Sequence, residues 1–332
     1  MKRILAIILS AALAAALLTG CGQMGPKPLE KVRVCEVTHS VFYAPQYAAI
    51  QLGFFQEEGI EVELSNGQGA DKVMAAVLSD NVEVGFAGPE AAIYVYNEGK
   101  EDYPRVFAQL TQRDGSFLVA REPDPDFSWK KLAGKHILPG RKGGVPYMAL
   151  EYVIRQNGLD PEKDLLMDNS IQFALMTGAF TGGTGDYVTI FEPTATELEN
   201  EGKGYIVASV GEAAGEIPYT AYFAKKSYLE KNHDLMLRFT RAVYRGQQWV
   251  ADHSAGEVAK AILPAFPDTD EEVLAVVVQR YKDIDAWNSD PVMSEEAFDL
   301  LQEVMTQAGE LAKHAPHGDV VDNSLAEEVI KQ

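Results

Sequence analysis

The chain has 332 residues, with 29 basic and 49 acidic side chains, a formal net charge of −20 and 46% apolar residues. This acidic balance disfavours nucleic acid and anionic lipid as partners, because both carry negative charge. The apolar content is sufficient for a packed core, and the length favours two lobes.

The first 20 residues have the pattern of a bacterial secretory signal. A short basic start precedes the almost wholly apolar run 4–18, which is too short to span a bilayer comfortably. The run leads into the sequence LTGC at residues 18–21, which resembles the lipobox of bacterial lipoproteins. That resemblance implies a signal peptide over 1–20, a lipid on the sulfur of Cys21, and a flexible tether over 21–30. An ordinary signal peptide with an incidental cysteine is the alternative.

Cysteine use agrees with an export route. Cys35 is the only cysteine besides Cys21, so a lipidated mature chain can form no internal disulfide. Cys35 lies in the strand-like run 32–37, where a packed strand cysteine is favoured over a reactive thiol.

Strands and helices alternate along the first part of the chain, which favours α/β lobes with largely parallel sheets. A first unit contains expected strands near 32–37, 60–64 and 83–86, and expected helices near 44–52 and 70–78. A second, similar unit contains an expected strand at 136–138, a Gly-rich loop at 139–145 and a helix from 146 to 157. Beyond residue 225 the pattern predicts mostly helices, at 229–252, 256–262, 270–283, 294–309 and 325–330.

A weak internal echo relates the two units. Residues 179–193 repeat the order of residues 76–90, which is a helix end, a turn, an acidic residue and a strand. The echo places Gly88, Pro89 and Glu90 opposite Phe191, Glu192 and Pro193, at the carboxyl ends of two strands. Ligands of open α/β sheets bind in the crevice outside those ends.

Residues 43–62, with the sequence YAPQYAAIQLGFFQEEGIEV, carry a family resemblance. This stretch resembles the opening of the substrate-binding family that serves nitrate, sulfonate and thiamine-pyrimidine-precursor importers. Further matches are residues 67–76, 82–91, 185–186, 192–193, 217–220 and 238–252, which together cover most of the mature chain. None of these motifs specifies the ligand.

The resemblance implies a type II-like, two-lobed periplasmic-binding-protein fold with mixed, largely parallel sheets and a two-crossover hinge. The crossovers are expected near 109–116 and 216–223. Lobe 1 would comprise residues 31–111 plus 218–332, and lobe 2 residues 112–217. Such a protein is expected to be an extracytoplasmic, lipid-anchored monomer that closes on a small molecule and delivers it to an ABC permease and its ATPase.

Candidate ligand contacts in lobe 1 lie in the loop after the first strand. His39, Phe42 and Tyr43 could stack on a flat ligand or hydrogen-bond to it. The alternative is that Phe42 and Tyr43 pack at the helix entry. The resemblance adds Tyr219, in the motif at 217–220.

Among the carboxylates, Glu90 and Asp71 lie near expected helix starts, where capping is a strong alternative to ligand contact. Glu192 ends a strand in an otherwise neutral context. A carboxylate facing a cleft can accept hydrogen bonds from an amino group of a heterocycle, so Glu192 is the favoured ligand contact.

An anion site is the competing expectation. The Gly-rich loop with Gly143 and Gly144 precedes a helix that carries Tyr147, and exposed N–H groups at such a terminus bind anions. Arg141 and Arg113 could add positive charge, although loop bases more often face solvent.

Enzyme signatures are absent from the sequence, which contains no hydrolase elbow, phosphate-binding loop or zinc motif. His314 and His317 form at most a weak metal pair in a polar tail, so no metal and no cofactor is expected. The related fungal pyrimidine-synthesis enzymes carry a cysteine-rich segment that this chain lacks. A binding lobe that serves a sensor stays open.

The favoured function is therefore binding and delivery of a small aromatic or amino-substituted heterocycle, such as a thiamine pyrimidine precursor. A sulfonate, nitrate or similar small anion is the alternative ligand.

Overall fold

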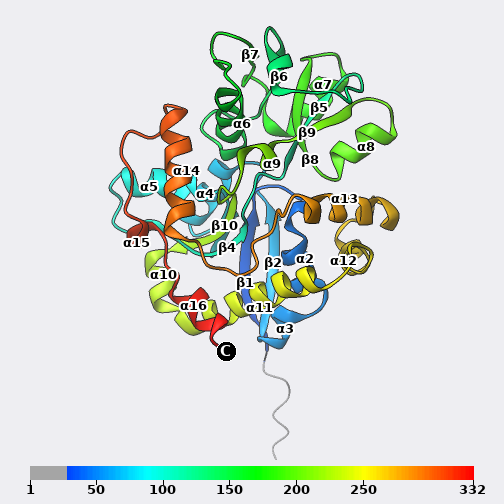
Figure 1. Ribbon diagram of the computed structural model, residues 1–332. Coiled ribbons are helices and arrows are strands. Elements are labelled where there is room, and N and C mark those ends of the chain that lie inside the picture. The colour runs from blue at the N-terminus through cyan, green and yellow to red at the C-terminus, as the bar shows by residue number, and fades with distance from the viewer. Residues whose placement is uncertain (1–27) are drawn as a thin grey trace, which may run out of the picture.

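The computed structural model describes residues 28–332 as two lobes, each built around one mixed β-sheet (Figure 1). The expected signal peptide, Cys21 and most of the expected tether lie outside these residues. Glu30, the last residue of the expected tether, already begins β1 (Glu30–Glu36), and its N–H donates to Gly59 O at 2.8 Å. Within 28–332, no helix combines the length and the apolar content that a membrane crossing requires.

The lower sheet in Figure 1 has the strand order β2-β1-β3-β10-β4. Its other strands are β2 (Ile60–Asn66), β3 (Val84–Ala87), β4 (Pro104–Thr111) and β10 (Thr220–Lys225). β1 is parallel to β2 and β3, whereas β10 is antiparallel to both β3 and β4. The four residues of β3 are all buried, as expected for a central strand with helices on both faces. Cys35 is buried in β1, which confirms the packed strand cysteine.

Helices from both ends of the chain cover this sheet. The helices that precede β4 are α2 (Ala44–Gln51), α3 (Phe54–Glu57), α4 (Ala70–Leu78) and α5 (Glu90–Asn97). Those that follow β10 are α10 (Lys226–Lys231), α11 (His233–Asp252), α12 (Ala255–Ile262), α13 (Glu271–Asp283), α14 (Glu295–Gln307), α15 (His317–Val320) and α16 (Ser324–Ile330). The long amphipathic α11 packs its apolar face on α2 and α16, so the C-terminal third completes the core of the first lobe.

One expected helix is interrupted. The periodicity predicts a single helix over 229–252, but α10 and α11 are separated at Asn232. The Asn232 side chain donates to Tyr228 O at 3.0 Å, and its backbone leaves the helical region with φ −119° and ψ 34°. Asparagine competes with the helical backbone for its own hydrogen bonds, which explains the break.

The upper sheet in Figure 1 has the order β7-β6-β8-β5-β9. Its strands are β5 (Ser116–Ala120), β6 (His136–Leu138), β7 (Leu166–Met167), β8 (Tyr187–Phe191) and β9 (Tyr205–Ser209). The helices of this lobe are α6 (Val145–Gln156), α7 (Met176–Thr181), α8 (Thr194–Asn200) and α9 (Val210–Ala214). Because β5 runs antiparallel to β8 and β9, this sheet is mixed like the first.

The chain passes between the sheets twice, over 112–115 from β4 to β5 and over 215–219 from α9 to β10. Both passages are tightly packed. A Cβ on Gly115 would lie 2.4 Å from the Phe42 ring, and a Cβ on Gly211, in α9 just before the second passage, would lie 2.1 Å from Asp114 O of the first passage. A larger side chain at Gly115 would push the first passage away from Phe42, and one at Gly211 would push α9 away from the first passage.

Candidate ligand-binding site

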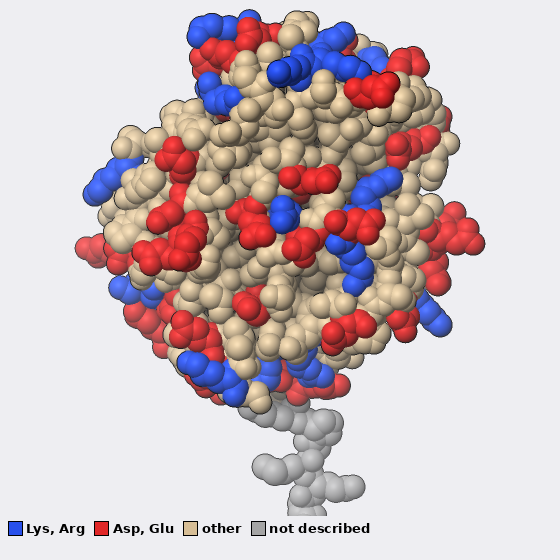
Figure 2. Space-filling model, viewed as in Figure 1, with Lys and Arg blue, Asp and Glu red and all other residues tan. Residues whose placement is uncertain are grey.

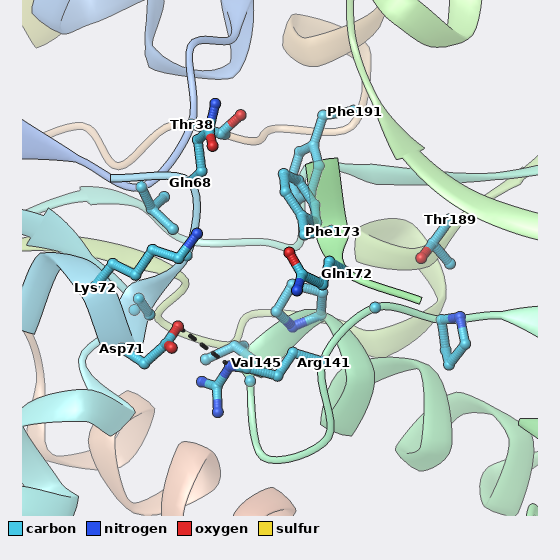
Figure 3. A pocket seen from close by; sticks show the side chains of 18 of the residues that line it. Thr38, Gln68, Asp71, Lys72, Arg141, Val145, Gln172, Phe173, Thr189 and Phe191 are labelled. Atoms are coloured by element: carbon cyan, nitrogen blue, oxygen red, sulfur yellow. Dashed lines mark ion pairs between the residues drawn. The ribbon is translucent and has the colours of Figure 1, made fainter. Parts of the chain in front are cut away.

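A cavity of about 330 Å³ lies between the two sheets, at the carboxyl ends of their parallel strands (Figure 3). Loops that follow β1, β2, β3, β6 and β7 contribute to its wall, and β8 contributes Thr189 and Phe191 from the strand itself. From the first lobe the lining residues are Val37, Thr38, Tyr43, Gln68, Gly69, Ala70, Asp71, Lys72, Gly88, Glu90, Tyr219 and Thr220. From the second lobe they are Pro139, Gly140, Arg141, Gly144, Val145, Pro146, Asn169, Ser170, Ile171, Gln172, Phe173, Thr189 and Phe191.

Aromatic rings form a continuous part of this wall. Phe173 and Phe191 lie together (Figure 3), with their ring centroids 6.1 Å apart. The centroid of the Phe191 ring is also 6.2 Å from that of Tyr219. Phe42 does not line the cavity but supports it from behind, at 5.9 Å from Phe191 and 5.6 Å from Tyr219. Such a wall suits a flat apolar ligand, because aromatic rings gain energy from stacked and edge-to-face contacts.

Charged side chains of both signs reach the cavity. Asp71 of α4 and Arg141 of the loop before α6 form an ion pair at 3.7 Å, which joins the two lobes (Figure 3). Lys72 also faces the cavity, and its side chain is exposed. The formal net charge is −20, and on the face shown in Figure 2 acidic side chains are spread over both lobes, with basic side chains among them.

Glu90, at the start of α5, is the buried charge of the site. It is 1% exposed, and its Oε2 has no hydrogen-bond partner. Burial raises the pKa of Glu90 to about 7, against the lowering effects of Arg141 and of the backbone amides of Glu90, Val145 and Ala91. A buried carboxylate with a free oxygen is the kind of group that a polar ligand would satisfy.

The lobes also meet around the cavity. On one side, the Tyr94 hydroxyl of α5 donates to Gly143 O at 2.9 Å, and Lys142 approaches Glu310 at 3.9 Å. Gly143 therefore lies at the seam between the lobes and does not line the cavity. Its φ of +77° lies in the left-handed region, which glycine adopts readily because it has no Cβ.

Glu192 does not face the ligand cavity, which corrects the favoured interpretation of the sequence. Its carboxylate accepts hydrogen bonds from Thr196 N and Thr196 Oγ1, both at 2.8 Å, and pairs with Arg280 of α13. Its backbone oxygen accepts from Ser40 Oγ at 2.5 Å, and its N–H donates to the Tyr281 hydroxyl at 3.2 Å. We call this group, Ser40, Glu192, Thr196, Arg280 and Tyr281, the Glu192 clasp; it joins β8 and α8 of the second lobe to the first lobe.

Four further candidates also lie outside the cavity wall. His39 is held by Glu36 Oε1 at 2.9 Å and Ala265 O at 2.8 Å. Arg113 pairs with Glu216 at 3.2 Å, and this contact joins the two passages between the lobes. Pro89 caps α5, and Tyr147 lies on α6. His39 and Arg113 thus have partners within the protein.

The sequence analysis predicts ligand contacts at Tyr43, Gly88, Glu90, Gly144 and Tyr219, and the structure brings all five into the wall of this cavity. Gly88, Glu90 and Phe191 share the cavity as the internal echo predicts. The sequence analysis missed residues that follow strand ends, namely Val37, Thr38, Gln68 and Pro139, although the rule for open α/β sheets could have found them. It also missed the segment 169–173, for which the sequence offers no motif.

The pair His314 and His317 has structural partners. His314 Nε2 lies 3.1 Å from Thr306 Oγ1, and His317 Nε2 lies 3.0 Å from Met293 O. Across residues 28–332 no cluster of three or more His, Cys, Asp or Glu side chains could hold a metal ion.

Known proteins resemble this chain in sequence and in fold. The model of the NMT1/THI5-like family matches residues 41–256. The chain is 46% identical over 315 residues to YtlA of Bacillus subtilis (strain 168), a candidate binding protein, and this match covers 95% of the chain and 94% of that protein.

Two solved structures share the fold. The alkanesulfonate-binding protein SsuA from Xanthomonas axonopodis pv. citri, bound to MOPS, matches with a TM-score of 0.73 and 13% identity, covering 90% of this chain and 100% of that one. The periplasmic nitrate-binding protein NrtA from Synechocystis PCC 6803 matches with a TM-score of 0.71 and 16% identity, covering 91% of this chain and 89% of that one. The chain therefore belongs to the NMT1/THI5-like family and is a substrate-binding protein, not an enzyme, with the fold of the periplasmic sulfonate and nitrate binders.

Proposed function

We propose that this protein is the extracytoplasmic, lipid-anchored substrate-binding component of an ABC-type importer. The ligand is a small aromatic or amino-substituted heterocycle, such as a thiamine pyrimidine precursor, which the two lobes enclose and deliver to the permease. A ligand-binding component of an ABC-type import system from Staphylococcus aureus has the same fold, with a TM-score of 0.73 at 14% identity. The protein acts as a monomer, since one chain supplies both walls of the cavity.

The observation that carries this proposal is the cavity itself. It lies between two lobes that are joined by two chain passages and touch each other at the seam. Its volume of about 330 Å³ is in the range of small-molecule sites, and its wall is mainly apolar and aromatic with a few polar groups. Tyr43, Phe173, Phe191 and Tyr219 would stack on or edge-contact a flat ring.

A small anion such as a sulfonate or nitrate is the second candidate ligand. Lys72 and Arg141 line the cavity, and the N-terminus of α6 opens onto it at Gly144. Backbone N–H groups at a helix N-terminus are a ready anion site.

A thermal-shift and calorimetry panel tests the ligand class. Hydroxymethylpyrimidine, the aminopyrimidine half of thiamine, is expected to raise the melting temperature, because a ligand that binds only the native state stabilises it. Methanesulfonate and nitrate are expected to have little effect. Solution scattering should show a smaller radius of gyration with the bound pyrimidine. Stabilisation by methanesulfonate or nitrate, with none by the pyrimidine, would favour the second candidate.

Replacement of Cys21 by Ser tests the anchor. The variant is expected to leave the membrane fraction, because several acyl chains, at about 0.8 kcal/mol per buried methylene, would hold the wild type there. Immunoblots of membrane and soluble fractions measure this, with circular dichroism as the control for folding. A Cys21→Ser protein that still sediments with membranes contradicts the lipoprotein assignment.

A further inference from the structure

Glu90 lies in the cavity wall, and one of its carboxylate oxygens, Oε2, is buried without a hydrogen-bond partner. The side chain is 1% exposed, so solvent does not compensate for the missing partner at Oε2. Gly88 leaves the space for this oxygen, since a Cβ there would lie 1.9 Å from Oε2. An unpaired buried acceptor of this kind costs about 1–3 kcal/mol, and a ligand donor would recover it.

The Glu90 carboxyl group lies beside the helix terminus that an anionic ligand would use. The backbone amide of Val145, the first residue of α6, lies close enough to the Glu90 carboxyl group to lower its pKa. Glu90 belongs to the first lobe and Val145 to the second, so this contact also spans the cleft. A negative charge of the protein itself therefore already fills the N-terminus of α6, and a sulfonate there would meet that charge.

The positive charges of the cavity wall do not outweigh Glu90. Arg141 is neutralised in part by Asp71 at 3.7 Å, and Arg141 and Lys72 are both exposed. Water and salt screen exposed charges strongly, whereas a buried charge acts through a lower effective dielectric. The field inside the closed cavity is therefore set by Glu90.

From these observations we infer that Glu90 determines the specificity of the cavity and takes a cationic, N–H-donating nitrogen group of a flat ligand, such as an amidine-like edge. This inference rests on the proposed function, because it assumes that the cavity is the ligand site. It goes further by assigning the sign of the ligand's charge and the oxygen, Oε2, that recognises it.

The inference predicts whether ligand binding releases or takes up a proton, and this direction can be measured. Burial raises the pKa of Glu90 to about 7, so the empty site is partly protonated just below neutral pH. The groups around Glu90 are Arg141, which lowers its pKa, and the neutral hydroxyls of Tyr43, Tyr94 and Tyr219. A cation binds the ionised carboxylate, so it releases a proton and loses affinity as the pH falls below about 7. An anion would favour the protonated carboxyl and reverse both signs.

The experiment uses three benzene derivatives of similar size that differ in charge: benzamidinium, benzamide and benzenesulfonate. The charge of benzamidinium is fixed at these pH values, so any proton released on binding comes from the protein. Calorimetry on the full mature chain at about pH 6.5, in two buffers of different ionisation enthalpy, counts that proton. We expect benzamidinium to bind best, to release a fraction of a proton, and to weaken at lower pH.

Two variants locate the effect at Glu90. Glu90→Gln keeps the size but removes the charge, and should weaken benzamidinium roughly tenfold to a hundredfold and abolish the proton release. Gly88→Ala keeps the charge but displaces Oε2, and should also weaken binding. Glu98→Gln is the matched control, because Glu98 lies at the other end of α5 with its side chain 61% exposed.

Several results would overturn the inference. These are tighter binding of benzenesulfonate with proton uptake, no binding of benzamidinium at millimolar concentration, or equal binding of benzamidinium to wild type and Glu90→Gln. The linkage measurement on the wild type decides the case even if Glu90→Gln does not fold. Binding of hydroxymethylpyrimidine without any dependence on Glu90 would leave the proposed function intact and remove only this inference.

Discussion

Replacement of Arg280 by Met is expected to weaken ligand binding about tenfold while both lobes stay folded. Arg280 lies outside the cavity wall, but it reaches from α13 to Glu192 and contacts Thr196 Oγ1 at 2.8 Å and Glu199 at 3.4 Å. Glu192 is fully buried and Arg280 is 27% exposed. The contact should therefore stabilise the joined lobes by about 1–2 kcal/mol, which lies between the contribution of a buried charged hydrogen bond and that of a surface ion pair.

Loss of the Arg280–Glu192 contact should destabilise the closed arrangement of the lobes, because this contact joins one lobe to the other. If closing becomes less favourable by that amount, the apparent affinity falls with the population of the closed form. Calorimetry with the ligand found in the panel measures the affinity, and scattering measures the closure. Arg245→Met is the matched control, since Arg245 pairs with Glu57 inside the first lobe. Equal affinities of Arg280→Met and wild type would show that the Glu192 clasp does not couple to binding.

Replacement of Gly246 by Ala is expected to destabilise the first lobe by about 1–3 kcal/mol, although alanine is the better helix former. Gly246 lies in α11, and a Cβ there would lie 2.3 Å from Pro45 O and 3.0 Å from the Ala49 Cβ of α2. A backbone oxygen cannot rotate away as a side chain can, so the helices must separate.

The opposite sign is expected at Gly256 of α12, where a Cβ meets no atom within 4 Å. Gly256→Ala should stabilise the protein by about 0.5–1 kcal/mol through helix propensity alone. Urea unfolding followed by circular dichroism measures both variants. A Gly246→Ala protein as stable as wild type would mean that α11 and α2 can move apart freely.

The regular elements could be predicted because their signals are local. The helix expected over 70–78 coincides with α4, and the strand expected over 136–138 coincides with β6. Both have an apolar spacing that a few neighbouring residues determine. The break at Asn232 was missed because a side-chain hydrogen bond, and not periodicity, causes it.

The site was harder to predict because its chemistry depends on distant partners. Glu192 stands alone in its sequence neighbourhood, yet Arg280, 88 positions later, pairs with it in the folded protein. Glu90 was recognised as a helix-capping candidate, but its free Oε2 follows from burial by both lobes, which no local pattern encodes. The cavity wall at 169–173 belongs to a loop whose position only the tertiary structure determines.

The place of β10 has a consequence for the order of folding. The second lobe is one continuous segment, whereas β3 and β4 of the first lobe pair only through β10, which follows that segment in the chain. During synthesis the N-terminal part of the chain is made first. The second lobe can therefore be complete while the first lobe still lacks β10, the strand between β3 and β4. Because long-range strand pairing is slow, the first lobe should be the last to become resistant to proteolysis during refolding.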